Sequence, residues 1–310
     1  MAEQEDQPQE EQPQEEEPQE EQAQEQPQEE EKQEEKQQPP SSDKKGLKRI
    51  VVGGATGAVG RHCVNVLVRD PRVCTVYALS RSNNAKPVDF YGLEEKSDPI
   101  DKIQHLQVDY TGDLDAQFKD LTFDAGISCL GVYTADVKNE ADFRAKEYEP
   151  NLKFARAAAA HGAKRWSYLS GAGVKQTDSK AWNQPLFSWV KGCIEKDLQK
   201  VDGLEFVNAA RPGFIAGRPD SNGWLEDVAN YFADSLVKTK MAVHRDDISV
   251  AMVYTVLNEE LGGPFVCYEN EEIKVAAAAY KSDMAGNQQT SEKKNDAQNE
   301  QQPDNQNDAQ

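Results

Sequence analysis

The fold of this chain is decided by one stretch, Ile-Val-Val-Gly-Gly-Ala-Thr-Gly-Ala-Val-Gly, at residues 50–60. The apolar, β-branched residues at its start are typical of a strand buried in a parallel sheet. From the glycines onward, apolar residues recur at helical spacing, at Val59, Cys63, Val66 and Leu67. A strand, a glycine-rich turn and a helix in this order are the context of a dinucleotide-binding loop.

The glycines of this turn have different expected roles. Gly54 allows the tight turn, Gly57 lets the backbone approach a pyrophosphate, and Gly60 lets the helix pack closely on the strand. The phosphates then lie over unpaired N–H groups at the positive end of the helix. The alternative is a glycine-rich turn that binds no ligand. The predicted phosphate-binding loop consists of Gly54, Thr56, Gly57, Ala58, Val59 and Gly60.

The second predicted strand, residues 73–80, ends directly before Arg81. An acidic residue at this place in a Rossmann unit binds the ribose 2′-hydroxyl of NAD, whereas an arginine suits the 2′-phosphate of NADP. The sequence Ser80-Arg81-Ser82 contains no acid, which favours NADP(H) over NAD(H). The alternative is a surface arginine at a strand end.

The chain has 310 residues and a net charge of −20, and most of its acidity lies in the two ends. Residues 1–45 carry 17 acidic and 4 basic residues, and residues 282–310 carry 6 acidic and 2 basic residues, which leaves −3 for residues 46–281. The first segment is rich in Gln, Glu and Pro and the last in Asn, Gln and Asp, so neither can bury enough apolar surface to fold. We expect two disordered tails around one folded domain, with protein partners held through the acidic tails as a further option.

The five cysteines are scattered, odd in number and never at C-x-x-C spacing, which is typical of reduced thiols. No apolar stretch approaches membrane-spanning length, and the N-terminal segment has no arginine before Arg49, unlike a mitochondrial transit peptide. We therefore expect a cytoplasmic protein without a membrane partner. The basic residues within 44–49 could give nuclear access, but they also fit a solvated strand edge.

Predicted strands and helices alternate along residues 46–281. Pro150 is expected to kink the longest helix or delay its regular part, and Gly162 to cap that helix. The alternation predicts an α/β fold, a doubly wound parallel sheet of the Rossmann type with a small C-terminal lobe on the substrate side. The predicted strands are 47–52, 73–80, 103–108, 123–130, 163–170, 204–210 and 265–268. Helices are predicted directly after the glycine turn and at 112–120, 140–161, 185–201, 223–237 and 246–258, with a loop at 83–102.

Six segments, in their order and spacing, carry a resemblance that extends over roughly residues 47–260. They are Gly-Gly-Ala-Thr-Gly-Ala-Val-Gly (53–60), Ser-Cys-Leu-Gly (128–131), Ala-Lys-Arg-Trp-Ser-Tyr-Leu-Ser (163–170), Val-Lys-Gly (190–192), Ala-Arg-Pro-Gly (210–213) and Asp-Asp-Ile-Ser-Val-Ala (246–251). Together with the G-x-x-G-x-x-G spacing, they resemble the atypical branch of the short-chain dehydrogenase/reductase family. The resemblance implies a Rossmann fold that binds a nicotinamide dinucleotide.

The resemblance also implies which side chains act on a substrate carbonyl. The family uses a Tyr four residues before a Lys: the Tyr donates a proton, and the Lys binds the nicotinamide ribose and lowers the pKa of the Tyr. Lys191 matches the lysine, but the residue four before it is Phe187. Ser170 matches the serine that polarises the carbonyl, although Gly171 follows where similar proteins have a second serine. Asn151 is the candidate for the asparagine that ties a water to the lysine.

Further cofactor contacts are implied in the same way. Asp109, after the third predicted strand, resembles the acid that contacts the adenine amine. Leu130 and Gly131 end the fourth strand, where the family lets the strand end lie under the cofactor. Lys191 completes this set. Many relatives dimerise through two helices, so the resemblance also leaves a homodimer open.

Phe187 has no proton to donate, so the Tyr-x-x-x-Lys motif is degraded. We expect an NADP(H)-binding protein that acts as a sensor or scaffold with little or no reductase activity, as regulatory NmrA-like relatives do. The alternative is an active NADP-dependent oxidoreductase that reduces a small carbonyl substrate. Its proton would come from Ser170, a bound water, Tyr133 or Tyr168. A protein that binds no nucleotide is a third interpretation, which the intact glycine turn opposes.

Other chemistry finds less support in the sequence. The four histidines lie far apart and lack metal-ligand spacing, and Asp246-Asp247 fits a helix cap better than an acid/base pair. No basic, aromatic-interleaved stretch suggests nucleic-acid binding. The tryptophans either line an apolar pocket on the substrate side or pack in the core. They are Trp166, Trp182, Trp189 and Trp224.

Overall fold

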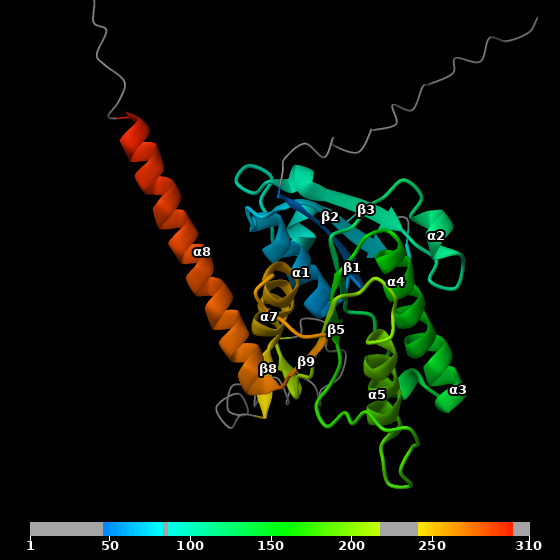
Figure 1. Ribbon diagram of the computed structural model, residues 1–310. Coiled ribbons are helices and arrows are strands. Elements are labelled where there is room, and N and C mark those ends of the chain that lie inside the picture. Colours follow the sequence, from blue (N-terminus) through cyan, green and yellow to red (C-terminus); the bar gives the residue numbers. More distant parts are fainter. Residues whose placement is uncertain (1–45, 83–85, 218–240, 300–310) are drawn as a thin grey trace, which may run out of the picture. The chain divides into compact units, whose positions relative to one another are not determined.

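Seven parallel strands form the main sheet of the computed structural model, which describes residues 46–82, 86–217 and 241–299. Their order is β3-β2-β1-β4-β5-β6-β9, which confirms the predicted doubly wound parallel sheet. The neighbouring strands β3, β2 and β1 are labelled in Figure 1. A separate parallel pair is formed by β7 (Phe214–Ala216) and β8 (Ala242–His244). The strands of the main sheet are β1 (Lys48–Gly53), β2 (Val73–Ser80), β3 (Ile103–Gln107), β4 (Ala125–Ser128), β5 (Arg165–Leu169), β6 (Phe206–Ala210) and β9 (Phe265–Tyr268).

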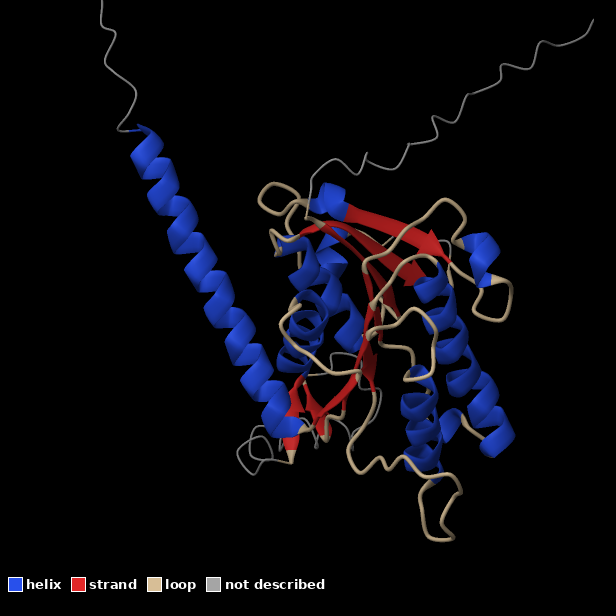
Figure 2. Cartoon of the chain, in the orientation of Figure 1, coloured by secondary structure: helices blue, strands red, loops and turns tan. Residues whose placement is uncertain are grey.

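Helices cover both faces of the sheet (Figure 2). α1, α7 and α8 lie on one face, and α4 and α5 lie on the other. The predicted helix at 223–237 lies outside the described residues. The helices are α1 (Ala58–Arg69), α2 (Leu114–Gln117), α3 (Glu140–Phe143), α4 (Glu149–Ala160), α5 (Leu186–Leu198), α7 (Arg245–Leu257) and α8 (Asn270–Asn299). Short 3₁₀ helices occupy Val88–Tyr91, Ile100–Lys102 and Thr134–Asp136.

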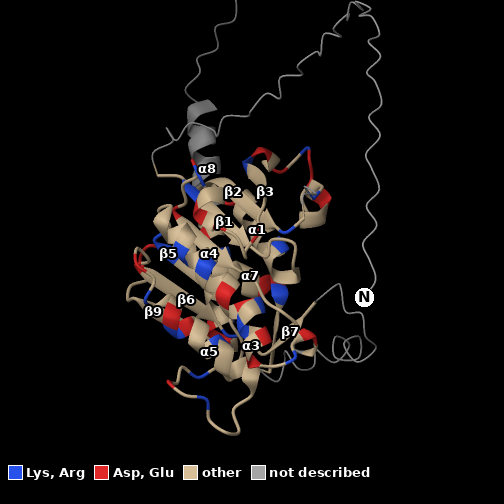
Figure 3. Ribbon diagram, turned by 90° about the vertical axis from the view of Figure 1, so that its right-hand side faces the viewer, with Lys and Arg blue, Asp and Glu red and all other residues tan. Residues whose placement is uncertain are grey.

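The central strands are buried on both faces. In β1, Ile50 and Val52 pack into the core beneath α1 and α7, whereas Val51 packs into the opposite core with Phe154 and Trp166. Charged residues lie mainly on helices and loops rather than in the strands of the main sheet (Figure 3). Burial on both faces explains why β1 is a nearly continuous apolar run in the sequence.

The strand order reverses at β1, which lies between β2 and β4. Val52 is opposite Ala78 of β2 on one side and Ile127 of β4 on the other. In open α/β sheets, ligands bind beyond the carboxyl ends of the strands at such a reversal. The glycine turn after β1 and residues 129–131 after β4 meet at this point.

The helical segment predicted at 140–161 is divided by a π-helical turn, Arg144–Tyr148, which joins α3 to α4. Pro150 stands in the first turn of α4. Its nitrogen carries no hydrogen and its ring displaces the carbonyl four residues earlier, which favours a wider turn at this point. The prediction that Pro150 delays the regular helix is confirmed. Gly162 has a φ of +100° after the last turn of α4, as predicted for a C-cap glycine.

The prediction of a disordered tail from residue 282 is wrong as far as Asn299, because these residues continue α8. The first turns of α8 pack on the domain through Ile273, Ala277 and Tyr280, all of which are buried. Extending a formed helix costs much less than starting one, so the packed turns support the polar residues that follow. Composition alone does not reveal this, because the anchoring residues precede the Asn- and Gln-rich segment.

Several elements are shorter than predicted. The helix predicted at 112–120 is reduced to α2, because Asp113 caps its start through Asp115 and Ala116 and Asp120 adopts a left-handed φ of +67°. The fourth strand spans four residues rather than the eight predicted. The predicted loop at 83–102 contains two of the 3₁₀ helices among its described residues.

Candidate nucleotide-binding site

The glycine turn has the geometry that its sequence predicts. Gly54 has a φ of +69°, and a Cβ added to it would lie 2.7 Å from the carbonyl oxygen of Cys129. A Cβ on Gly60 would lie 2.1 Å from the carbonyl oxygen of Gly54, so the helix can approach the turn only because residue 60 has no side chain. Both glycines therefore stand where a side chain would collide with backbone atoms. Gly57 is the N-cap of α1, and no side chain caps the free N–H groups there.

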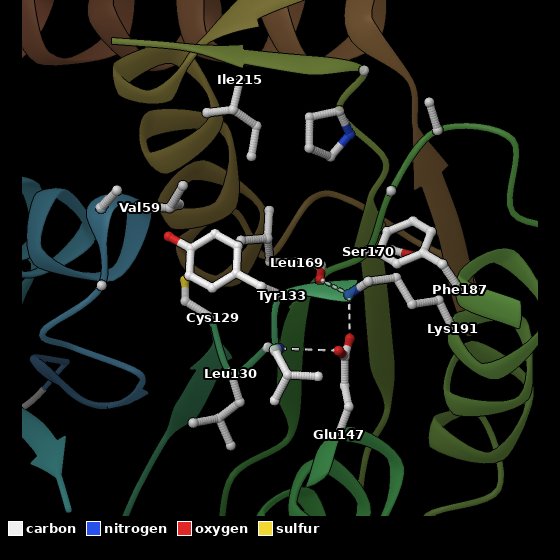
Figure 4. A pocket seen from close by; sticks show the side chains of 18 of the residues that line it. Val59, Cys129, Leu130, Tyr133, Glu147, Leu169, Ser170, Phe187, Lys191 and Ile215 are labelled. Atoms are coloured by element: carbon white, nitrogen blue, oxygen red, sulfur yellow. Dashed lines mark hydrogen bonds and ion pairs between the residues drawn. The ribbon is translucent and has the colours of Figure 1, made fainter. Parts of the chain in front are cut away.

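A cleft of about 740 Å³ opens beside this turn, beyond the carboxyl ends of β1, β4 and β5 (Figure 4). It brings together residues that are up to 184 positions apart in the chain, from Gly57 in the turn to Met241 before β8. Nine of the predicted site residues line it: Gly57, Ala58, Val59, Gly60, Leu130, Gly131, Ser170, Phe187 and Lys191.

Gly54, Thr56, Arg81 and Asp109 are not among the residues that line the cleft. Arg81 is exposed directly after β2. The carboxylate of Asp109 accepts bonds from the hydroxyl and the N–H of Thr111, at 2.6 and 2.8 Å. These bonds, the hydroxyl first, lower the pKa of Asp109. Both side chains therefore lie on the adjoining edge formed by β2 and β3 rather than in the cleft.

Lys191 forms the most buried ion pair of the cleft. Its Nζ lies 2.5 Å from Oε1 of Glu147, and the two side chains are 7 % and 0 % exposed (Figure 4). Nζ also donates to the hydroxyl of Tyr168 and to the carbonyl of Leu169, at 3.1 Å each. The hydroxyl of Tyr168 donates in turn to Oε1 of Glu147 at 3.4 Å. The three N–H bonds that an ammonium can donate are thus all directed at protein oxygens.

Phe187 lies one turn before Lys191, where the family has its tyrosine. The centroid of its ring is 5.2 Å from Nζ of Lys191 and 6.4 Å from the ring of Phe143. The end of the ring lies against Gly171, where a Cβ would come within 2.7 Å of Cζ. Gly171 and Phe187 are therefore a matched pair, since the ring fills space that a serine at 171 would need.

Ser170 lines the cleft, but its hydroxyl is directed at a buried carboxylate. Oγ donates to Oε1 of Glu195 at 2.5 Å. Glu195 is fully buried and also accepts two bonds from the guanidinium of Arg211, at 2.9 and 2.5 Å, and one from Gln176 at 3.0 Å. A hydroxyl that donates to a charged acceptor is held firmly. Its proton is therefore not free for a substrate carbonyl.

Asn151 does not take the place implied for it. Its Oδ1 accepts a bond from Oγ of Ser128 at 2.5 Å, and its Nδ2 donates to the backbone carbonyl of Glu147 at 2.8 Å. The residue that contacts Lys191 is instead Glu147, which the sequence analysis missed. The only signal was indirect: Pro150 marks a break in the helix, but the register of the π-helical turn decides which side chain faces inward.

The aromatic candidates are divided between core and surface. Trp166 and Trp189 are buried in the core, Trp182 is 93 % exposed, and Trp224 lies outside the described residues. The described tryptophans therefore do not line the cleft. Tyr133 does line it, with 59 % of its surface exposed.

The two tyrosines considered as proton donors differ in their surroundings. Tyr168 is fully buried, and burial, followed by the charge of Glu147, raises the pKa of its hydroxyl. Its hydroxyl is already bonded to Lys191 and Glu147. Tyr133 stands across the cleft on the loop after β4 (Figure 4), where its side chain can reach a bound molecule.

The described part of the chain offers neither a metal-binding cluster nor a membrane-spanning helix. Within it, no group of three or more His, Cys, Asp or Glu side chains is placed to hold a metal ion. None of its helices combines the length and the apolar character that crossing a membrane requires. All five cysteines are present as free thiols.

Comparison with known proteins agrees with this geometry. Residues 50–181 match the model of the NAD dependent epimerase/dehydratase family. The protein fmp52 of Emericella nidulans is 26 % identical over 194 residues, which cover 62 % of this chain and 77 % of that protein. The fmp52 of Aspergillus clavatus is 28 % identical over 189 residues, or 60 % of this chain and 75 % of that one.

Solved structures support the fold. A UDP-N-acetylglucosamine 4-epimerase from Methanobrevibacter ruminantium aligns with a TM-score of 0.52 at 16 % identity, over 72 % of this chain and 76 % of that one. The Bordetella bronchiseptica enzyme WbmG in complex with NAD aligns with a TM-score of 0.51 at 16 % identity, over 77 % and 80 %. At this identity these structures show the fold alone, a Rossmann-like α/β fold like that of the NAD-dependent epimerases.

The relatives contradict the predicted cytoplasmic or nuclear location. Both fmp52 proteins are named as mitochondrial. The prediction rested on the absence of arginine before Arg49. That observation tests only for an Arg-rich, amphipathic transit peptide at the N-terminus, and it does not bear on other routes into the organelle.

Proposed function

We propose that this protein binds NADP(H) in the cleft and acts as a cofactor-binding sensor or scaffold with little or no reductase activity. The observation that carries the proposal is Phe187, whose ring stands one turn before Lys191 where a carbonyl reductase of this type needs a hydroxyl. We further propose a narrower relationship, to the Tat-interacting-protein oxidoreductase, on the basis of the six segments at 53–60, 128–131, 163–170, 190–192, 210–213 and 246–251.

The residues around the cleft suit a nicotinamide dinucleotide. A pyrophosphate would lie beside the uncapped N-terminus of α1, where Gly57 and Gly60 line the cleft without side chains. Arg81 would hold the 2′-phosphate, and Asp109 the adenine. Leu130 and Gly131 would support the cofactor, and Lys191 would face its nicotinamide ribose. When bound in its reduced form, the cofactor supplies a hydride.

Carbonyl reduction needs a proton as well as a hydride, and the side chains that would supply it are missing or engaged. A general acid typically contributes about 10²–10⁴-fold to the rate. Phe187 cannot donate a proton, and the hydroxyl of Ser170 is held by Glu195. Binding of the cofactor depends on neither group. The site therefore favours binding over turnover.

The alternative function is an active NADP-dependent reductase of a small carbonyl compound. The observation that favours it is Tyr133, an exposed tyrosine that lines the cleft. In that case wild-type protein would reduce small aldehydes with NADPH, and Tyr133→Phe would lower kcat by about 10²-fold or more, the loss expected for a general acid. Unchanged turnover in Tyr133→Phe would exclude Tyr133 as the donor.

The segments outside the domain complete the proposal. Residues 1–45 and 300–310 would supply contacts to protein partners, and the domain of residues 46–281 would carry the cofactor, as a monomer or a homodimer. The names of the fmp52 relatives suggest that these contacts occur in mitochondria. Fractionation of cells that express the full chain tests this location.

Thermal unfolding of the full-length protein with NADPH and, separately, with NADH tests the proposal. Binding to the folded state alone adds about 2.7 kcal/mol of stability at a hundredfold excess over the Kd. We expect a larger rise in Tm with NADPH than with NADH. Arg81→Ala should remove this difference and leave the effect of NADH unchanged. A Tm that responds to neither nucleotide would refute the proposal.

A further inference from the structure

The cleft contains one buried pair of opposite charges, Glu147 and Lys191. These charges would act on a nicotinamide ring bound beside them. We propose that Glu147 sets the relative affinity of the site for oxidised and reduced cofactor by neutralising Lys191. The inference rests on the proposed function, because it assumes that the nicotinamide end of the cofactor lies beside Lys191.

Both members of the pair are held in place from several directions. Oε2 of Glu147 accepts the N–H of Val132 at 3.2 Å, and Oε1 receives the ammonium of Lys191 and the hydroxyl of Tyr168. The ammonium also donates to the carbonyl of Leu169. The side chain of Glu147 is fully buried, and it points toward the cleft from the π-helical turn before α4 (Figure 4). The two charges therefore cannot separate without loss of several hydrogen bonds.

Few charges lie near this pair in the cleft. Among the described residues that line it, Glu147 and Lys191 are the only Asp, Glu, Lys, Arg or His, and the nearby Glu195 behind Ser170 is itself paired with Arg211. Away from solvent, the energy between two charges is several times larger than in water. Glu147 is therefore the lining residue that decides whether this part of the cleft is neutral or positive.

The two redox states of the cofactor differ in charge at the ring. The oxidised nicotinamide carries one positive charge, and the reduced ring carries none. An ammonium without a counter-ion would repel the oxidised ring and leave affinity for the reduced ring almost unchanged. With Glu147 only 2.5 Å from Nζ, this repulsion is largely cancelled, and the site accepts both forms. Glu147 is thus a positioning and charge-balancing residue rather than a catalytic one.

Titration calorimetry with NADP⁺ and NADPH tests the inference in four full-length proteins: wild type, Glu147→Gln, Lys191→Met and the double variant. The measured quantity is the ratio of the Kd of NADP⁺ to the Kd of NADPH. We expect Glu147→Gln to raise this ratio about tenfold, which corresponds to about 1.4 kcal/mol. Lys191→Met should lower it below the wild-type value, and the double variant should return it to within about threefold of wild type, because both charges are then gone.

The matched control is Asp70→Asn, which also converts a buried, ion-paired acid to its amide. Asp70 pairs with Arg72 at the opposite end of α1 from the glycine turn. This control should leave the ratio unchanged even where it lowers the Tm. If Glu147→Gln fails to fold, Lys191→Met can still be compared with the double variant. The ratio of the Kd of NADP⁺ to the Kd of NADPH should be higher in the double variant, because Gln replaces the negative charge of Glu147 there.

The possible failures are distinguishable. A ratio that stays the same in all four proteins, with both nucleotides bound, would overturn the role of Glu147 and leave the proposed function intact. Absence of binding to wild-type protein would overturn both. A fall in affinity of equal size for the two nucleotides in Glu147→Gln would show a purely structural pair, and it would also overturn the inference.

Discussion

Substitution of Phe187 by Tyr tests whether a missing hydroxyl limits this site. The change adds one oxygen to Cζ of a ring that already stands beside Lys191, with Nζ 5.2 Å from its centroid. The end of the ring lies against Gly171, which has no side chain to oppose the added atom. We therefore expect Phe187→Tyr to fold, to bind NADPH as wild type does, and to gain reductase activity toward small aldehydes.

The size of the gain follows from the bonds of Lys191. A well-placed general acid contributes about 10²–10⁴-fold to the rate, or about 2.7–5.4 kcal/mol at 1.36 kcal/mol per factor of ten. The upper end requires an ammonium that lowers the pKa of the new tyrosine. Here the ammonium is neutralised by Glu147 and donates to Tyr168 and Leu169. We therefore expect a gain near the lower end, about 10²-fold.

Oxidation of NADPH, followed by absorbance with a panel of small aldehydes, measures this gain. Phe187→Leu is the matched control, because it changes the packing against Gly171 without adding a hydroxyl, and it should leave the rate at the wild-type level. Substantial turnover by wild type that Phe187→Tyr does not raise would refute the reasoning. A similar gain in Phe187→Leu would also refute it, since packing rather than proton donation would then be responsible.

Three further predictions concern stability. Gly60→Ala should lower the free energy of unfolding by about 1–3 kcal/mol in urea, because the added Cβ would overlap the carbonyl of Gly54. The same substitution should abolish the Tm response to NADPH. The control Gly131→Ala should have little effect on stability, because the nearest atom to its Cβ is 4.0 Å away. Burial lowers the pKa of His62 in the folded protein, despite Asp246 at 3.6 Å. Because the unfolded chain then binds a proton at higher pH than the folded protein does, the free energy of unfolding should fall as the pH decreases through about 6.5. His62→Gln should reduce the slope of stability against pH, and an unchanged slope would contradict this prediction. Tyr280→Phe should cost about 1 kcal/mol in urea unfolding, because its hydroxyl donates to the buried Asp70 at 2.9 Å, whereas the exposed Tyr133→Phe should cost nothing measurable.

The features that the sequence predicted well depend on neighbouring residues. The turn at Gly54–Gly60 is specified by glycines three residues apart, and its geometry follows from backbone contacts within the same segment. The strands were recognisable because burial on both faces requires an uninterrupted apolar run. Pro150 predicted a delayed helix for an equally local reason, since it lacks an N–H.

The features that the sequence did not predict depend on distant contacts. Glu147 reaches Lys191 across 44 positions of the chain, and only the π-helical register turns its side chain inward. Ser170 was expected to face a substrate, but Arg211 and Glu195 together hold its hydroxyl. For α8, composition indicated disorder, whereas packing of Tyr280 and its neighbours decides the outcome. In each case a tertiary contact outweighs a local preference.

Under the proposed function, cofactor binding and carbonyl chemistry would depend on different parts of this site, so one could be lost without the other. The pyrophosphate would be held by the turn after β1, whose backbone geometry depends on Gly54 and Gly60. Carbonyl reduction would need a hydroxyl at position 187 and another at position 170. Position 187 is Phe, whose ring packs on Gly171, and the hydroxyl of Ser170 donates to Glu195. Restoring activity should therefore require changes on the carbonyl side of the cleft alone, and the affinity for NADPH should remain unchanged as activity returns.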